Sequence, residues 1–208
     1  VAGRRIGGSD AAKTFTIVAN DPDARTTTAT GVGLQTASAG TEARFSIVAS
    51  DRYGNVLTAA AASTPTVEVA VTAIGGDGAC GTVSLVTPAP AVTWNSNLNR
   101  YDVAYTPTIS GPSSVRVKLG TGDSVRDSPF AGVVTPGTAH AGMSTVTGSG
   151  VHGAVVNGAG KVTIHARDAN GGEKTTGGDP FRAYVVDANG ALASPTVTIT
   201  DNDDGTYS

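Results

Sequence analysis

Short segments in which apolar and polar residues alternate recur along the whole chain, separated by turns rich in glycine, proline, aspartate and asparagine. In the segment FSIVASD, Phe45, Ile47 and Ala49 fall on one face, because the side chains of a strand alternate with a period of two. TVEVAVT at 66–72 alternates in the same way. About seven such segments lie between 23 and 137 at the spacing typical of a β-sandwich.

The pattern occurs twice. Asp51 ends the first segment, and 117 positions later (168 minus 51) Asp168 ends the similar segment VTIHARD. The glycines of the following turns, Gly54 and Gly171, and the upstream sequences GVGL and GSGV show the same spacing. Three landmarks at one spacing indicate a tandem repeat. We therefore predict an all-β chain of tandem immunoglobulin-like β-sandwich repeats.

The repeat also predicts where the units begin and end. The stretch around Phe15 resembles the stretch around Phe130, which would close the first full unit. We expect residues 1–22 to be the C-terminal end of a preceding repeat, 23–137 to be one complete repeat, and 138–208 to be a second repeat truncated at its C-terminus. On this interpretation the sequence is a fragment of a longer protein.

Composition narrows the classes of partner. The formal charge is −3 and no basic run occurs, which argues against nucleic acid, whose phosphates require a cluster of Lys and Arg. No apolar run reaches the roughly 20 residues that span a bilayer, so we expect no membrane contact within this fragment. The one cysteine, Cys80, cannot form an internal disulfide, which favours a reducing, cytoplasmic compartment.

Candidate catalytic and metal-binding patterns are weak. His165 alternates with Ile164 and Ala166, so its side chain should face solvent, and no Ser, His and Asp set has a spacing that indicates a triad. The tail DNDDG at 201–205 fits a hairpin turn better than an EF-hand loop, because its glycine is one position early and no glutamate follows. A calcium site there would need ligands from a neighbouring domain. We predict no enzyme, no cofactor and no metal site.

The order of short motifs resembles the filamin-type immunoglobulin repeat. The first unit carries GVGL, then Ala49-Ser50-Asp51, Tyr101, PTISG and SPF, and the second carries GSGV, Ala166-Arg167-Asp168 and DNDDGTY. Two departures concern the first unit, which has LNRY in place of D-G-T-Y and an insertion at about 74–90.

The resemblance implies a non-catalytic structural and interaction module, a spacer and docking region of a large cytoskeletal or cilium-associated protein such as a dynein heavy chain. The expected location is then cytoplasmic, on the cytoskeleton, a cilium or an axoneme. The alternative is an extracellular adhesin-type array, for example in a gamete-surface protein. The expected partners are other proteins, bound by strand addition or by domain packing.

In such repeats a partner adds a strand to an exposed sheet edge, because the edge offers a row of unpaired N–H and C=O groups. The resemblance places this edge at 65–72 and at 180–186. The candidate docking residues are Thr66, Glu68 and Ala70 in the first unit, and Arg182, Tyr184 and Val186 in the second. Whether the insertion at 74–90 already pairs with the first edge is left open, which makes the second unit the favoured docking edge.

Overall fold

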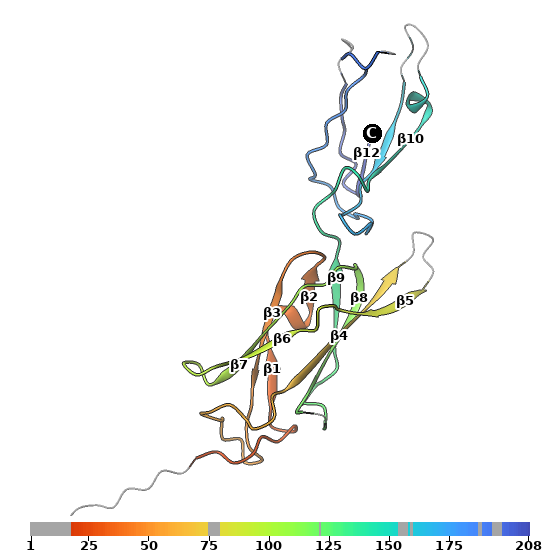
Figure 1. The fold of residues 1–208 in the computed structure, drawn as a ribbon. Helices are drawn as coiled ribbons and strands as arrows, with labels where there is room; N and C mark the ends of the chain where they lie inside the picture. The colour runs from red at the N-terminus through yellow and green to blue at the C-terminus, as the bar shows by residue number, and fades with distance from the viewer. Residues whose placement is uncertain are drawn as a thin grey trace, which may run out of the picture.

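The computed structural model describes residues 18–74, 80–120, 122–153, 158, 160–186, 189–192 and 197–208. Its elements are β strands and two short 3₁₀ helices, arranged as two units in series along the chain (Figure 1). The first unit contains β1 (Thr28–Thr30), η1 (Val32–Leu34), β2 (Thr36–Ser38), β3 (Ala43–Val48), β4 (Thr66–Ile74), β5 (Cys80–Leu85), β6 (Ala91–Asn95), β7 (Arg100–Tyr105), β8 (Gly111–Lys118) and β9 (Phe130–Thr135). The expected end of a preceding repeat, residues 1–22, lies mostly outside the described residues.

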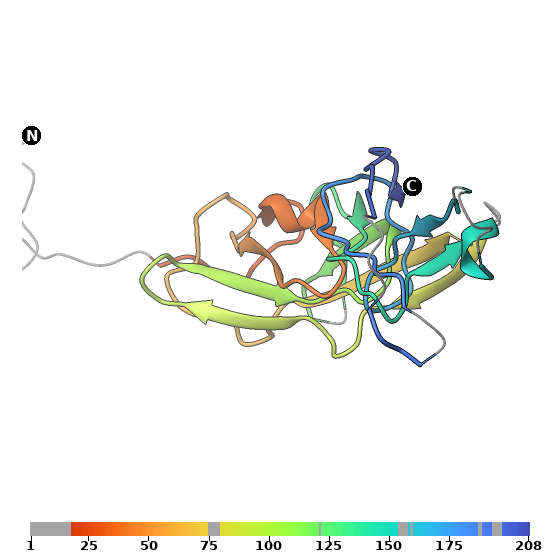
Figure 2. The same ribbon diagram turned by 90° about the horizontal axis from the view of Figure 1, so that it is seen from above.

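Two sheets form the first unit. One has the strand order β1-β3-β7-β6 and the other β2-β9-β8-β4-β5. Every pairing is antiparallel except that of β2 with β9, which is parallel. Figure 2 shows β6 and β7 as a hairpin that extends from the body of the unit. The predicted all-β, immunoglobulin-like sandwich is confirmed.

The core of the first unit lies between the two sheets. Ile47 and Ala49 are fully buried and Phe45 is nearly so, as the alternation predicts. On the facing sheet Val115 and Val117 are also fully buried, while Arg116 between them is exposed. The period-two pattern therefore assigns the inward face of both central strands correctly.

In the described residues of the second unit, β10 (Thr145–Thr147), β11 (Thr163–His165) and β12 (Thr206–Tyr207) form one small sheet, with η2 (Ser149–Val151) after β10. Its buried apolar core consists of Ile164, Ala166 and Tyr207. His165 is exposed on β11, as predicted.

The prediction of a strand at 180–186 is wrong. The described residues there make one isolated bridge, Val186 to Leu192, and no ladder. In the first unit the matching strand, β4, is held along most of its length by β8. The described part of the second unit offers no strand in the place of β8, so an apolar alternation has nothing to pair with.

Both repeats have the same turn after the strand that ends in aspartate. Asp51 accepts hydrogen bonds from the backbone N–H groups of Tyr53 and Asn55, both at 2.9 Å. Asp168 accepts the equivalent bonds from Asn170 at 2.9 Å and Gly172 at 2.8 Å. A buried carboxylate thus satisfies the backbone donors of a tight turn in each unit.

We expect Asp51 to make the first unit sensitive to acid. The hydrogen bond from the Asn55 side chain, with those from nearby backbone N–H groups, lowers the pKa of Asp51 from 3.8 to about 2. The folded state therefore favours the carboxylate, so its stabilising effect is complete above about pH 4 and is lost as the pH falls through 2. Urea midpoints of wild type and Asp51→Asn should differ most at neutral pH and converge toward pH 2. Asp127→Asn, at an exposed carboxylate, should have the urea midpoint of wild type at every pH. A difference in midpoint between wild type and Asp51→Asn that does not change with pH would contradict this role of Asp51.

Candidate protein-docking site

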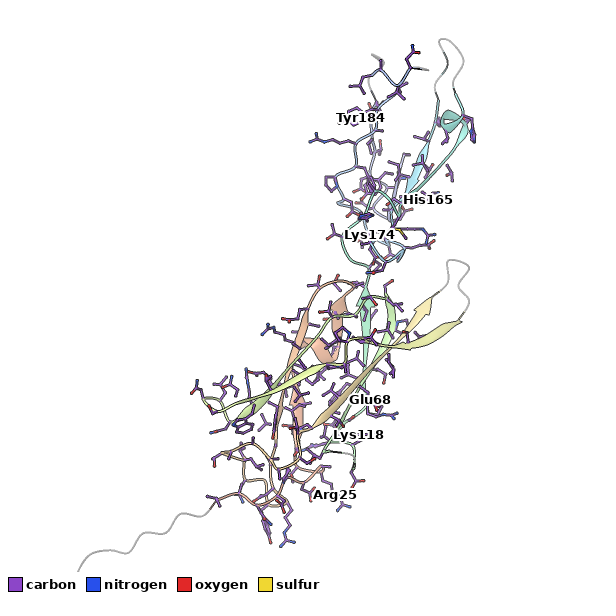
Figure 3. The ribbon with its side chains drawn as sticks, viewed as in Figure 1. Arg25, Glu68, Lys118, His165, Lys174 and Tyr184 are labelled. Carbon is purple, nitrogen blue, oxygen red and sulfur yellow. The ribbon has the colours of Figure 1, made fainter. Side chains whose placement is uncertain are left out.

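β4 places the predicted docking residues of the first unit on the outer face of its sheet. Thr66 and Glu68 are exposed and Ala70 is half-buried. The alternate residues Val67, Val69 and Val71 are buried in the core. Figure 3 shows Glu68 and Lys118 on the outside of the first unit, on neighbouring strands.

The insertion supplies β5, which pairs with the edge of β4. Ala70 lies opposite Leu85, Val71 opposite Ser84, and the carbonyl of Val69 accepts a bond of 2.9 Å from the Val86 N–H. The sequence left open whether the insertion pairs with the edge of β4, and the structure shows that it does. Ala70 is therefore covered on the side where a partner strand was expected, and only the first residues of β4, Thr66 to Glu68, extend past the pairing.

β5 is consequently the edge strand on this side of the sheet, and β2 is the edge strand on the other side. Ser84 lies opposite Val71, and Val86 bonds to Val69, so the backbone groups of Ser84 and Val86 face β4. Because bonding alternates along an antiparallel strand, the N–H and C=O of Leu85 point away from β4. Within the described part of the chain no strand pairs with that side, and the Leu85 side chain is 61% exposed.

The composition of β5 does not protect this edge. Natural edge strands usually carry a charge, a proline or a bulge that discourages pairing with other chains. The strand sequence CGTVSL contains no charged residue and no proline, and the irregularity in the β4–β5 pairing lies between Thr72 and Ile74, outside the regular stretch that contains Leu85. β5 is therefore suited to accept an added strand.

The structure does not bring the predicted residues of the second unit together with those of the first. Arg182, Tyr184 and Val186 are exposed, and Tyr184, 66% exposed, lies on the outside of the second unit in Figure 3. They form no strand, so they offer separate side chains and no regular backbone edge. Their role in docking stays a prediction.

A polar network on the four-stranded sheet was missed by sequence reasoning. Asp102 on β7 accepts bonds from the side chains of Asn95 at 2.8 Å, Arg100 at 2.8 Å and Ser46 at 3.4 Å. The Asn95 bond, with the charge of Arg100, lowers the pKa of Asp102. Ser46, Arg100 and Asp102 of this network line an open hollow, together with Thr30 of β1 and further residues of β3, β6 and β7. Only the strand register places these residues side by side, and no spacing in the sequence could indicate it.

Among the described residues no group of three or more His, Cys, Asp or Glu side chains is arranged to hold a metal ion. None of the described helices is long and apolar enough to cross a membrane.

Comparison with known proteins identifies the fold independently. The family model of the Filamin/ABP280 repeat matches residues 21–131 and 138–208. The chain is similar to the Escherichia coli adhesin FdeC, with 18% identity, a TM-score of 0.57, and coverage of 92% of this chain and 56% of FdeC. It also matches the filamin domain of Lin-41 (20% identity, TM-score 0.42, 55% of this chain and 97% of that domain). A further match is InvD of Yersinia pseudotuberculosis (13% identity, TM-score 0.43, coverage of 90% of this chain and 54% of InvD).

Proposed function

The chain belongs to the Filamin/ABP280 repeat family, and from this premise we propose that it is a non-catalytic spacer and protein-docking region of a larger cytoskeletal or cilium-associated protein, such as a dynein heavy chain. The family is one of structural modules, which supports a structural or interaction role. The proposed partner is a protein segment that adds as a strand.

The observation that carries the docking role is the outer edge of β5. Its backbone groups at Leu85 face away from β4, and its sequence contains neither a charge nor a proline. An added strand would gain main-chain hydrogen bonds there, with alternate side chains providing the specificity. In this chain the insertion therefore moves the docking edge outward, from β4 to β5.

Leu85→Pro should weaken binding of an extended peptide, because it removes an outward N–H without breaking the pairing of β5 with β4. Peptides selected from a random library on the wild-type chain are the probes, and fluorescence polarisation gives their Kd. We expect Kd to rise about tenfold or more, equivalent to about 1.4 kcal/mol. Leu85→Val, which keeps the N–H, should bind as wild type.

Two results would place docking elsewhere. If Leu85→Pro keeps its circular dichroism spectrum and binds the peptides with unchanged Kd, strand addition at β5 is excluded. If Tyr184→Pro instead abolishes binding, the second unit provides the docking surface, as the sequence alone favours.

The second candidate is an extracellular adhesin-type array. The structural similarity to the adhesin FdeC over 92% of this chain favours it, although at 18% identity this similarity concerns the fold. Antibody labelling of intact and permeabilised cells separates the two candidates. A cytoskeletal spacer should be labelled only after permeabilisation, whereas an adhesin should be labelled on intact cells.

A further inference from the structure

The junction between the two units has almost no free length. On the first unit's side, Thr135 at the end of β9 pairs with Ser38, and its carbonyl accepts a bond of 2.9 Å from the Ala39 N–H. On the second unit's side, the N–H of Gly137 donates to Asp168 Oδ2 at 2.9 Å. Pro136 alone lies between these anchors, and its φ is fixed by its ring. Its carbonyl also accepts a bond from Ser38 Oγ at 3.4 Å.

A buried polar cluster of the second unit binds the backbone of the junction. Lys174 Nζ donates to the Gly137 carbonyl at 3.1 Å and pairs with Asp179 at 3.4 Å, and both side chains are mostly buried. Asp179 also accepts bonds from the Ala139 N–H at 3.4 Å and the Tyr207 hydroxyl at 3.1 Å. Figure 3 shows Lys174 at the end of the second unit that faces the first. Three consecutive polar anchors therefore hold the backbone between 137 and 139.

The two units also touch beside the junction. A Cβ on Gly172, in the turn capped by Asp168, would lie 2.7 Å from Ser110 Oγ of the first unit. This turn therefore packs closely on the loop that precedes β8. A side chain there would force the Ser110 hydroxyl or the Asp168 carboxylate to move, so the glycine permits this close contact.

The first unit repeats part of this arrangement. The N–H of Asn20, 117 positions before Gly137, donates to Asp51 Oδ2 at 3.2 Å. Leu57 occupies the position equivalent to Lys174, and both N–H groups bond to the matching alanine carbonyl, Ala49 or Ala166, at 2.9 Å. The aspartate anchor is thus common to both units, whereas the Lys174–Asp179 clamp belongs to the second.

We infer that the two units form one stiff pair whose relative orientation is fixed by the Asp168 anchor and the Lys174–Asp179 clamp. Units joined within a chain move relative to each other by default unless their interface prevents it. Here a single proline and a buried, charge-assisted network replace a flexible linker. The inference deepens the spacer part of the proposed function, and it does not depend on docking at β5.

The test is the distribution of distances between two spin labels on the full chain. Labels replace the exposed residues Arg116 on β8 and Val146 on β10, in a background where Cys80 is replaced by serine. Double electron–electron resonance should give one narrow distance peak for the otherwise unchanged chain. Two glycines inserted after Pro136 should broaden that peak about twofold or more, because they create a flexible joint without altering either unit.

Asp168→Asn and Lys174→Leu then test the clamp. An asparagine side chain has only one acceptor oxygen, so it cannot accept bonds both from the turn and from Gly137 as the two carboxylate oxygens do. Leucine is the residue that the first unit carries at the position of Lys174. Each change should broaden the peak relative to the parent, whereas Asp51→Asn, the matched change in the first unit, should not. Glu173→Gln, next to Lys174 in sequence and outside the clamp, should also leave the peak narrow.

A parent distribution as broad as that of the glycine insertion would overturn the stiff pair. A narrow parent peak that stays narrow in both clamp variants would overturn the role of the clamp. Either result leaves peptide binding at β5 unaffected, so failure of this inference and failure of the docking proposal are distinguishable.

Discussion

Replacing Phe45 by alanine is expected to destabilise the first unit by about 3–5 kcal/mol. Phe45 is 4% exposed and packs edge-on against Tyr105, with ring centroids 6.4 Å apart. It lies on β3, opposite Val103 of β7, at the centre of the sandwich. The lost stability has two parts. The first is the free energy that burial of the ring contributes, and the second is the cost of the cavity left between two sheets that cannot close over it. Urea denaturation followed by tryptophan fluorescence measures it, since Trp94 belongs to the same unit.

Arg44→Ala is the matched control. Arg44 is the preceding residue on the same strand, but its side chain is 75% exposed and forms a surface ion pair with Glu42. A surface change of this kind should alter the free energy of unfolding by about 0.5 kcal/mol or less. Equal midpoints for Phe45→Ala and Arg44→Ala would show that β3 does not present Phe45 to the core.

The sequence predicts those parts of the fold that depend on local pattern. Alternation alone assigns the buried face of β3 and of β8, because each strand carries polar residues on the opposite face. The aspartate at the end of each repeated strand marks a turn because its carboxylate bonds to backbone donors a few residues further on. Both features are written within a few neighbouring residues.

Features that depend on partner strands could not be predicted in this way. The segment at 180–186 also alternates, but β4 has β8 beside it and the segment has no such neighbour in the described residues. The pairing of β5 with β4 was one of two open possibilities, because periodicity does not say which strand a loop returns to. The hydrogen bonds to Gly137 could not be predicted from the sequence either, since it is the folded structure that brings Lys174 close to Asp179 and to Gly137.

The two glycines of GVGL, used as a repeat landmark, have a physical explanation in close backbone approach. Gly31 has φ +135, and a Cβ there would lie 2.9 Å from the Cα of Phe45. A Cβ on Gly33 would lie 2.6 Å from the Arg44 carbonyl oxygen. The Gly33 carbonyl also accepts a hydrogen bond from the Tyr105 hydroxyl. The 3₁₀ turn thus lies directly on β3, as Gly148, with φ +117, does on Lys161 in the second unit.

Gly33→Ala should therefore cost about 3 kcal/mol, at the upper end of what overpacking causes, because the atoms that must move are backbone atoms of β3. Displacing the turn would also strain the Tyr105 bond. Val32→Ala provides the control within the same turn, since Val32 is 74% exposed and should change stability by about 0.5 kcal/mol or less. The urea midpoints of the two variants test this prediction. If Gly33→Ala unfolds at the same urea concentration as Val32→Ala, the close approach of the turn to β3 does not require glycine. The recurrence of this glycine in both repeats would then have another origin.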